Sequence, residues 1–125
     1  PPMPTVEFVE IAADSVDRAK EFYSKVFGWT SEEMPGPMEY LVARTTGVQG
    51  EPGVMIGMMA RQHPMQRITA YVGVEDLDAT AARITEHGGQ VMMGKTPVPN
   101  MGWFAVCTDS EDNGFALWQN DPNAG

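Results

Sequence analysis

Cysteine and histidine, the side chains that most often bind transition metals or pair as nucleophile and base, are almost absent from this sequence. Its 125 residues include one cysteine, Cys107, and two histidines, His63 and His87. A single cysteine excludes a disulfide within the chain. His63 precedes a proline in a polar segment and His87 comes near the end of an expected helix, so we expect both at the surface. A catalytic cysteine or a histidine-rich metal centre is therefore not predicted.

Positive charge is also scarce, because 8 lysines and arginines are outnumbered by 17 aspartates and glutamates, which gives a net charge of −9. The phosphates of nucleic acid would be repelled by such a chain. No apolar run approaches the roughly 20 residues that span a bilayer, so we expect a cytoplasmic protein that binds neither nucleic acid nor membrane. A cationic or neutral small molecule suits this charge, although an acidic surface can also serve solubility alone.

What the sequence does contain is a repeat. Residues 8–28 (FVEIAADSVDRAKEFYSKVFG) and 69–89 (TAYVGVEDLDATAARITEHGG) each read as a short strand, an Asp-containing turn, an amphipathic helix and a closing glycine. Matching positions, such as Ile11 and Val72, are 61 residues apart. A repeat of this length indicates two copies of one supersecondary unit. We expect a single domain over residues 1–125, with repeat one at about 6–60, a linker at 61–66, repeat two at about 67–119 and a polar, mobile tail at 120–125.

Hydrophobic periodicity and turn residues predict the elements of each repeat. In repeat one a helix follows a cap at Asp14 or Ser15 and ends at Phe27, before Gly28. The remaining expected elements are a second helix at 77–87, a loop at 94–102, and strands at 6–12, 29–33, 39–45, 53–60, 68–74, 90–93, 103–108 and 115–119.

This order of elements predicts an α+β fold of two tandem βαβββ units, which form a cupped, partly open mixed-sheet barrel with the helices outside. Because strand side chains alternate between faces, the faces away from the helices are predicted to line a shared concavity. Its expected lining is Phe8, Glu10, Tyr40, Val42, Arg44, Met55, Thr69, Tyr71, Trp103, Ala105, Cys107, Ala116 and Trp118.

Glu10 is the only carboxylate in that predicted lining. Set between Phe8 and Ala12 and near aromatic rings, it would be partly desolvated, a condition that suits a general base or a contact for a cationic ligand. Alternatively it is a structural carboxylate, paired with Arg44 or hydrogen-bonded to a Tyr or Trp donor. Arg44 in turn either anchors an anionic ligand through its guanidinium or lies in solvent at a strand end.

Aromatic and sulfur-containing side chains are the other features of the predicted lining. The rings of Tyr40, Tyr71, Trp103 and Trp118 can form stacking or cation–π walls around a ligand, or can pack as ordinary core. Ten methionines, clustered as MIGMM and VMM, can adapt to an irregular ligand or fill gaps in a core or a dimer interface.

The two βαβββ units, the segment DRAKEFYSKVFGW and the closing segment DSEDNGFALWQ resemble the vicinal-oxygen-chelate superfamily, which groups glyoxalases, bleomycin-resistance proteins and extradiol dioxygenases. The segments EIAADSVDRAKEFYSKVFGW and KTPVPNMGWFAV are similar to small glyoxalase-like proteins. The resemblance extends from about Val6 to Gln119 and implies the fold described above. It leaves the activity open, because members include lyases, epimerases, dioxygenases, transferases and drug-binding proteins.

In metal-using members of this superfamily, the metal ligands come from the first and last strands of each unit. Carried onto this sequence, the resemblance puts those positions at Phe8, Thr69, Met55 and Ala116. These side chains lack the imidazole or carboxylate donors that nickel, zinc, iron or manganese needs. We therefore predict neither a metal nor another cofactor.

We predict a small-molecule binding or sequestering protein of the glyoxalase/bleomycin-resistance type, a homodimer that takes a small hydrophobic or cationic ligand. The alternative is a glyoxalase-like lyase or isomerase that uses Glu10 as catalytic base, with an atypical metal or none. A third hypothesis is a partner-binding module whose cleft is filled by its own side chains. The predicted ligand-binding residues are Phe8, Glu10, Tyr40, Arg44, Met55, Thr69, Tyr71, Trp103, Ala116 and Trp118.

Overall fold

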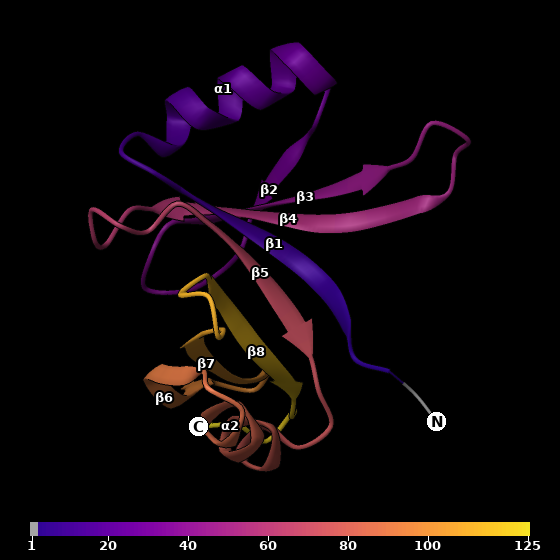
Figure 1. Ribbon diagram of the computed structural model, residues 1–125. Coiled ribbons are helices and arrows are strands. Elements are labelled where there is room, and N and C mark those ends of the chain that lie inside the picture. The colour runs from indigo at the N-terminus through magenta and orange to yellow at the C-terminus, as the bar shows by residue number, and fades with distance from the viewer. Residues whose placement is uncertain (1–2) are drawn as a thin grey trace. The chain divides into compact units, whose positions relative to one another are not determined.

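The computed structural model describes residues 3–125, which form two compact units (Figure 1). The N-terminal unit comprises residues 7–69. The C-terminal unit comprises residues 70–125 together with residues 3–6. None of the helices within residues 3–125 has the length and apolarity needed to cross a membrane.

The N-terminal unit has the element order β1, α1, β2, β3, β4. Its strands pair in the order β2-β3-β4-β1, with β1 parallel to β4 and the other pairs antiparallel. The elements span Thr5–Ala13 (β1), Val16–Phe27 (α1), Ser31–Glu33 (β2), Tyr40–Thr46 (β3) and Pro52–Ala60 (β4).

The C-terminal unit repeats this plan, with the pairing order β5-β8-β7-β6 and β5 parallel to β8. Its elements span Ile68–Gly73 (β5, which begins in the last two residues of the N-terminal unit), Leu77–Glu86 (α2), Gln90–Val98 (β6), Gly102–Thr108 (β7) and Gly114–Asn120 (β8). The predicted α+β class and the two tandem βαβββ units are therefore confirmed.

Each helix begins at a side-chain cap and covers one face of the sheet of its own unit. The Ser15 hydroxyl caps α1 and the Asp76 carboxylate caps α2, each by accepting a backbone N–H of the first turn. Gly28 ends α1 at φ 75°, a left-handed conformation that favours glycine. The two cores lie under these helices and comprise Ile11, Val16, Leu41, Ala43, Ile56 and Met58 in one unit and Leu77, Ala105, Cys107 and Leu117 in the other.

Strand β6 is longer than predicted. It continues from Gln90 to Val98, through residues 94–98 that were expected to be loop. Two register shifts interrupt its pairing with β7, one between Val91 and Met93 and one between Met93 and Thr96. Because β6 is the edge of the sheet, Pro97 can occupy it without leaving a neighbouring strand short of a donor.

The last residues, expected to be a mobile tail, instead fold back on the turn between β6 and β7. The backbone N–H of Asp121 donates to the carbonyl of Met101 (2.9 Å), and the backbone N–H of Asn100 donates to the carbonyl of Ala124 (2.9 Å). Ala124 is buried.

Candidate functional site

Five of the predicted site residues share one face of the N-terminal unit, the face opposite α1. On β1, Val9 and Ile11 pack with the core under α1, so that Phe8 and Glu10 point to the other side. In register, Phe8 is opposite Met55 and Met55 is opposite Arg44. The alternation predicted for this half of the lining therefore agrees with the structure.

Glu10 is the buried carboxylate of this face, with 8% of its surface exposed. The Tyr40 hydroxyl donates a hydrogen bond to Glu10 Oε2 (2.8 Å). The sequence is compatible with Arg44, a tyrosine or a tryptophan as the partner of Glu10. Arg44 is exposed, and its Nη1 donates instead to the sulfur of Met55 (3.5 Å).

Gly57 explains how Tyr40 reaches Glu10. On β4, Gly57 lies opposite Glu10, while Tyr40 lies opposite Met59, two residues along the same strand. The tyrosine ring crosses β4 at Gly57, where an added Cβ would be 2.1 Å from the Tyr40 hydroxyl oxygen. Sequence reasoning missed this residue, although a glycine within an apolar strand often marks such a close approach.

The C-terminal unit brings Tyr71, Ala116 and Trp118 together on the face opposite α2. Tyr71 is opposite Ala116, and Trp118 is opposite Gly73 on one side and Phe104 on the other. The Trp118 indole donates to the Asn120 side chain (2.7 Å). Thr69, also a predicted site residue, lies half-buried in β5 at the last position of the N-terminal unit.

Trp103 does not share that face, contrary to the prediction. With Ala105 and Cys107 it packs on the core under α2, and its indole donates to Asp121 (3.0 Å). Phe104, which the sequence reasoning missed, takes the opposite face of β7. Because both faces of this strand carry apolar residues, alternation alone does not say which face points toward the helix.

The removal of Cys107 from the predicted lining has a chemical consequence. Burial raises the pKa of its thiol, which favours the neutral form. An unreactive core cysteine is consistent with the expectation that Cys107 is not a nucleophile.

The register also changes how the two repeats correspond. Ile11 is opposite Met58 in one unit, and Val72 is opposite Leu117 in the other. The first strands therefore match at a spacing of 61 residues and the last strands at 59, so the counterpart of Met55 is Gly114 rather than Ala116.

The residues at these positions do not fit a transition metal. Phenylalanine, glycine and alanine have no donor atom, threonine offers a neutral hydroxyl, and a methionine thioether suits soft copper(I). Across residues 3–125, no three His, Cys, Asp or Glu side chains are grouped closely enough to hold a metal ion.

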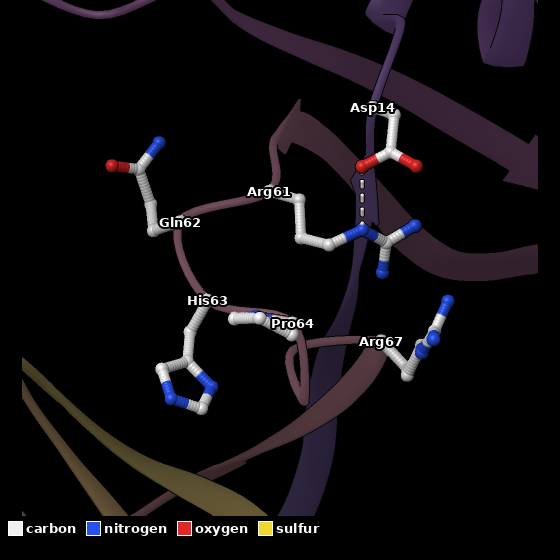
Figure 2. A pocket seen from close by; sticks show the side chains of 6 residues that line it. All are labelled: Asp14, Arg61, Gln62, His63, Pro64 and Arg67. Atoms are coloured by element: carbon white, nitrogen blue, oxygen red, sulfur yellow. Dashed lines mark hydrogen bonds and ion pairs between the residues drawn. The ribbon is translucent and has the colours of Figure 1, made fainter.

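A second polar site lies in the N-terminal unit, at the segment that follows β4, and Figure 2 shows it. Asp14, Arg61, Gln62, His63, Pro64 and Arg67 line this hollow. Arg61 Nε donates to Asp14 Oδ1 (2.9 Å), and Arg61 Nη1 donates to the Gln66 carbonyl. The hydrogen bond from Arg61, and then its positive charge, lower the pKa of the Asp14 carboxyl. Sequence reasoning treated this segment only as a polar linker.

Comparison with known proteins identifies relatives over nearly the whole chain. Residues 5–117 match the Glyoxalase/Bleomycin resistance protein/Dioxygenase superfamily. The putative glyoxylase CFP32 of Mycobacterium bovis is 30% identical over 124 residues, which are 97% of this chain and 48% of that protein. The anthracycline biosynthesis protein DnrV of Streptomyces peucetius is 27% identical over 129 residues, covering 88% of this chain and 45% of that protein. The chain thus spans about half the length of these relatives.

Solved structures give the same fold at lower identity. A methylmalonyl-CoA epimerase of Streptomyces coelicolor, in complex with 2-nitronate-propionyl-CoA, superposes with a TM-score of 0.69 at 14% identity and covers 99% of both chains. The methylmalonyl-CoA epimerase of Mycobacterium tuberculosis gives a TM-score of 0.66 at 18% identity, over 93% of this chain and 87% of that one. At these identities the likeness concerns the fold alone.

Proposed function

The chain belongs to the Glyoxalase/Bleomycin resistance protein/Dioxygenase superfamily, and from this we propose that it binds and sequesters a small hydrophobic or cationic molecule without a metal ion. We place the ligand on the face of the N-terminal unit opposite α1, which carries Phe8, Glu10, Tyr40, Arg44 and Met55. Trp103 packs on the core under α2 and is not among the proposed ligand contacts.

The buried carboxylate of Glu10 is the observation that carries this proposal. Burying an ionised carboxylate costs free energy unless hydrogen bonds or an opposite charge compensate it. The Tyr40 hydroxyl supplies one such bond at 2.8 Å and fixes the orientation of the carboxylate. The negative charge of the carboxylate would attract a cationic group of the ligand, and the neighbouring rings of Phe8 and Tyr40 would favour the same cation through their π faces.

The absence of a transition metal in this proposal rests on donor chemistry. Phe8 and Met55 are register partners on β1 and β4, the positions to which the superfamily resemblance assigns metal ligands. A phenyl ring and a thioether at these positions favour an apolar or cationic ligand over nickel, zinc, iron or manganese.

A pair of ligands of equal shape tests the proposal. Benzyltrimethylammonium is a hydrophobic cation, and neopentylbenzene is its neutral carbon isostere. We expect the cation to bind more tightly than the neutral isostere. The substitution Glu10→Gln should weaken binding of the cation about tenfold or more and change binding of the neutral isostere little. Titration calorimetry measures both. Equal affinity of wild type and Glu10→Gln for the cation would contradict the role of Glu10.

The relatives suggest a further ligand for the same experiment. DnrV is named an anthracycline biosynthesis protein, and an anthracycline joins fused aromatic rings to an amine. The intrinsic fluorescence of an anthracycline makes its binding easy to follow.

An enzymatic function is the second candidate, a glyoxalase-like lyase or isomerase with Glu10 as general base. The Tyr40 hydrogen bond favours it, because a fixed carboxylate held out of water is suited to proton abstraction. Elemental analysis and turnover of α-oxoaldehyde–thiol adducts separate the two functions. One tightly held metal per chain, with turnover that Glu10→Gln abolishes, would favour the enzyme and contradict the metal-free binder.

A homodimer remains part of the proposal. Helix α1 exposes the apolar side chains of Phe22, Val26 and Phe27, each more than half accessible. Apolar groups gathered in this way are typical of association surfaces. Sedimentation equilibrium measures the mass of the particle in solution.

A further inference from the structure

Positive charge, scarce in the whole chain, gathers at one place in the N-terminal unit. Of the 8 lysines and arginines, three, Arg18, Arg61 and Arg67, lie close enough to Asp14 to stabilise its ionised form. Arg61 and Arg67 line the same hollow, of about 400 Å³ (Figure 2). We propose that this hollow binds the phosphoryl group of a small phosphorylated molecule, or free phosphate.

The end of β1 positions both arginines. The backbone N–H of Arg61 donates to Ala13 (2.9 Å), and the carbonyl of Arg67 accepts from Ala12 (2.9 Å). Two consecutive residues of one strand thus fix both ends of the segment 61–67. This closure brings the two guanidinium side chains to the same hollow, as Figure 2 shows.

The segment between the arginines is fixed by its own hydrogen bonds. Gln62 N donates to the Gln66 side chain (2.7 Å), and Gln66 N donates to the His63 carbonyl (2.9 Å). Because these backbone donors are already used, recognition of a ligand falls to the side chains. Their placement before binding reduces the entropy lost when a ligand is held.

His63 adds a donor to the hollow. Its Nδ1 accepts the backbone N–H of Met65 (3.1 Å). An imidazole that accepts at Nδ1 carries its proton at Nε2 when neutral, so Nε2–H is the donor that remains. His63 lines the same hollow, and in Figure 2 its ring lies on the side of Pro64 away from the two guanidinium groups.

The charge balance favours an anion. Arg61 and Arg67 contribute two positive charges, and the ionised Asp14 offsets one of them. Arg61 has two of its nitrogens engaged, by Asp14 and by the Gln66 carbonyl, whereas within residues 3–125 the Arg67 guanidinium forms no hydrogen bond or ion pair. A planar guanidinium with two parallel donors matches the geometry of a phosphoryl group. Because the hollow is open to solvent, an organic group attached to the phosphate can extend out of it.

Titration of the protein with inorganic phosphate and with phenyl phosphate tests this site, followed by chemical shifts of the arginine and histidine side chains. Binding should saturate at millimolar concentration or below. We expect Arg67→Ala to weaken it about tenfold, and Arg67→Lys, which keeps the charge but loses the planar pair of donors, to weaken it less. Arg83→Ala is the matched control, because Arg83 is an exposed arginine on α2 of the other unit.

The two probes separate the sources of the phosphoryl group. Tighter binding of phenyl phosphate supports a phosphorylated small molecule, and equal binding supports free phosphate. The proposal is overturned if neither probe saturates, or if Arg67→Ala and Arg83→Ala weaken binding equally, since the effect would then be one of net charge. Folding of each variant is checked by circular dichroism, and the lysine variant retains the test if the alanine variant fails to fold.

Discussion

At the scale of single residues, the geometry of the proposed site depends on one missing side chain. Tyr40 contacts Glu10 only because Gly57 leaves the space above β4 empty. The sequence predicted that Glu10 and Tyr40 share a face, and it offered a tyrosine as one possible partner. It did not single out Tyr40, because the path of the ring depends on which residue of β4 lies between them, and that requires the register.

Gly57→Ala should separate Tyr40 from Glu10. The new methyl group would lie 2.1 Å from the Tyr40 hydroxyl oxygen and 2.7 Å from its Cζ, so that the ring must move. We expect a loss of about 1–3 kcal/mol of unfolding free energy, as for overpacked sites, and weaker binding of benzyltrimethylammonium. Urea unfolding and calorimetry measure the two effects.

Gly94→Ala provides the control for that substitution. Gly94 also lies in a strand, β6, but an added Cβ would meet no atom within 4 Å. It should change neither stability nor binding measurably. A Gly57→Ala protein that binds the cation as well as wild type would contradict the role given to the Tyr40 hydrogen bond.

At the scale of elements, helices were easier to predict than strands. The caps, the periodic apolar positions and Gly28 all lie within the helical segment or next to it, so local sequence marks both ends of α1. β6 and β7 were harder because their boundaries and faces depend on partners distant in the sequence. Strand β6 extends beyond Met93 because it pairs with β7 there. Trp103, rather than Phe104, faces the helix because it packs on the core under α2.

The two helix caps should contribute in a predictable order. Ser15 Oγ accepts from Arg18 N at 3.2 Å, whereas the Asp76 carboxylate accepts from Ala79 N at 3.0 Å. We expect Ser15→Ala to cost about 1 kcal/mol, and Asp76→Ala to cost somewhat more, because a negative charge also interacts favourably with the helix dipole. Amide hydrogen exchange at Arg18 and Ala79, together with urea unfolding, reports each loss.

A conservative variant is the control for the Ser15 substitution. Ser15→Thr keeps the hydroxyl and should retain most of the stability. If Ser15→Ala left the exchange of the Arg18 amide unchanged, the cap would not stabilise the helix.

At the scale of the whole molecule, the repeat predicted the architecture but not its detailed correspondence. A spacing of 61 residues holds from the first strand of each unit through the helix caps Ser15 and Asp76. This spacing does not hold for the last strands, β4 and β8, in which matching residues are 59 positions apart. Sequence similarity is weak in those strands, and a shift of two residues keeps every apolar side chain on its own face. Hydrophobic pattern therefore could not detect the shift, and only strand pairing shows it.

The stability of the whole chain should pass through a maximum as the pH falls from neutrality. Near pH 7 the net charge of −9 destabilises the compact state through self-repulsion, and mild acidification relieves this. Three aspartates then act in the opposite direction, because hydrogen bonds lower the pKa of each in the folded chain: Arg61 to Asp14, Asn113 to Asp109 and Trp103 to Asp121.

A carboxyl whose pKa is depressed by folding stabilises the native state above its unfolded pKa, and this contribution disappears as the pH falls through the folded pKa. The loss should therefore set in below about pH 4, where aspartates of the unfolded chain become protonated. Urea unfolding between pH 7 and pH 2.5 measures the profile. Asp109→Ala, which removes the acceptor for Glu111 N (2.8 Å) and Asn113 N (2.9 Å), should flatten the acid limb. Glu86→Gln, at a carboxylate that accepts no hydrogen bond within residues 3–125, should not. Acid limbs of equal slope in both variants would show that protonation of Asp109 does not contribute to the loss of stability in acid.

Added salt should stabilise the chain at pH 7, because it screens the same excess of negative charge.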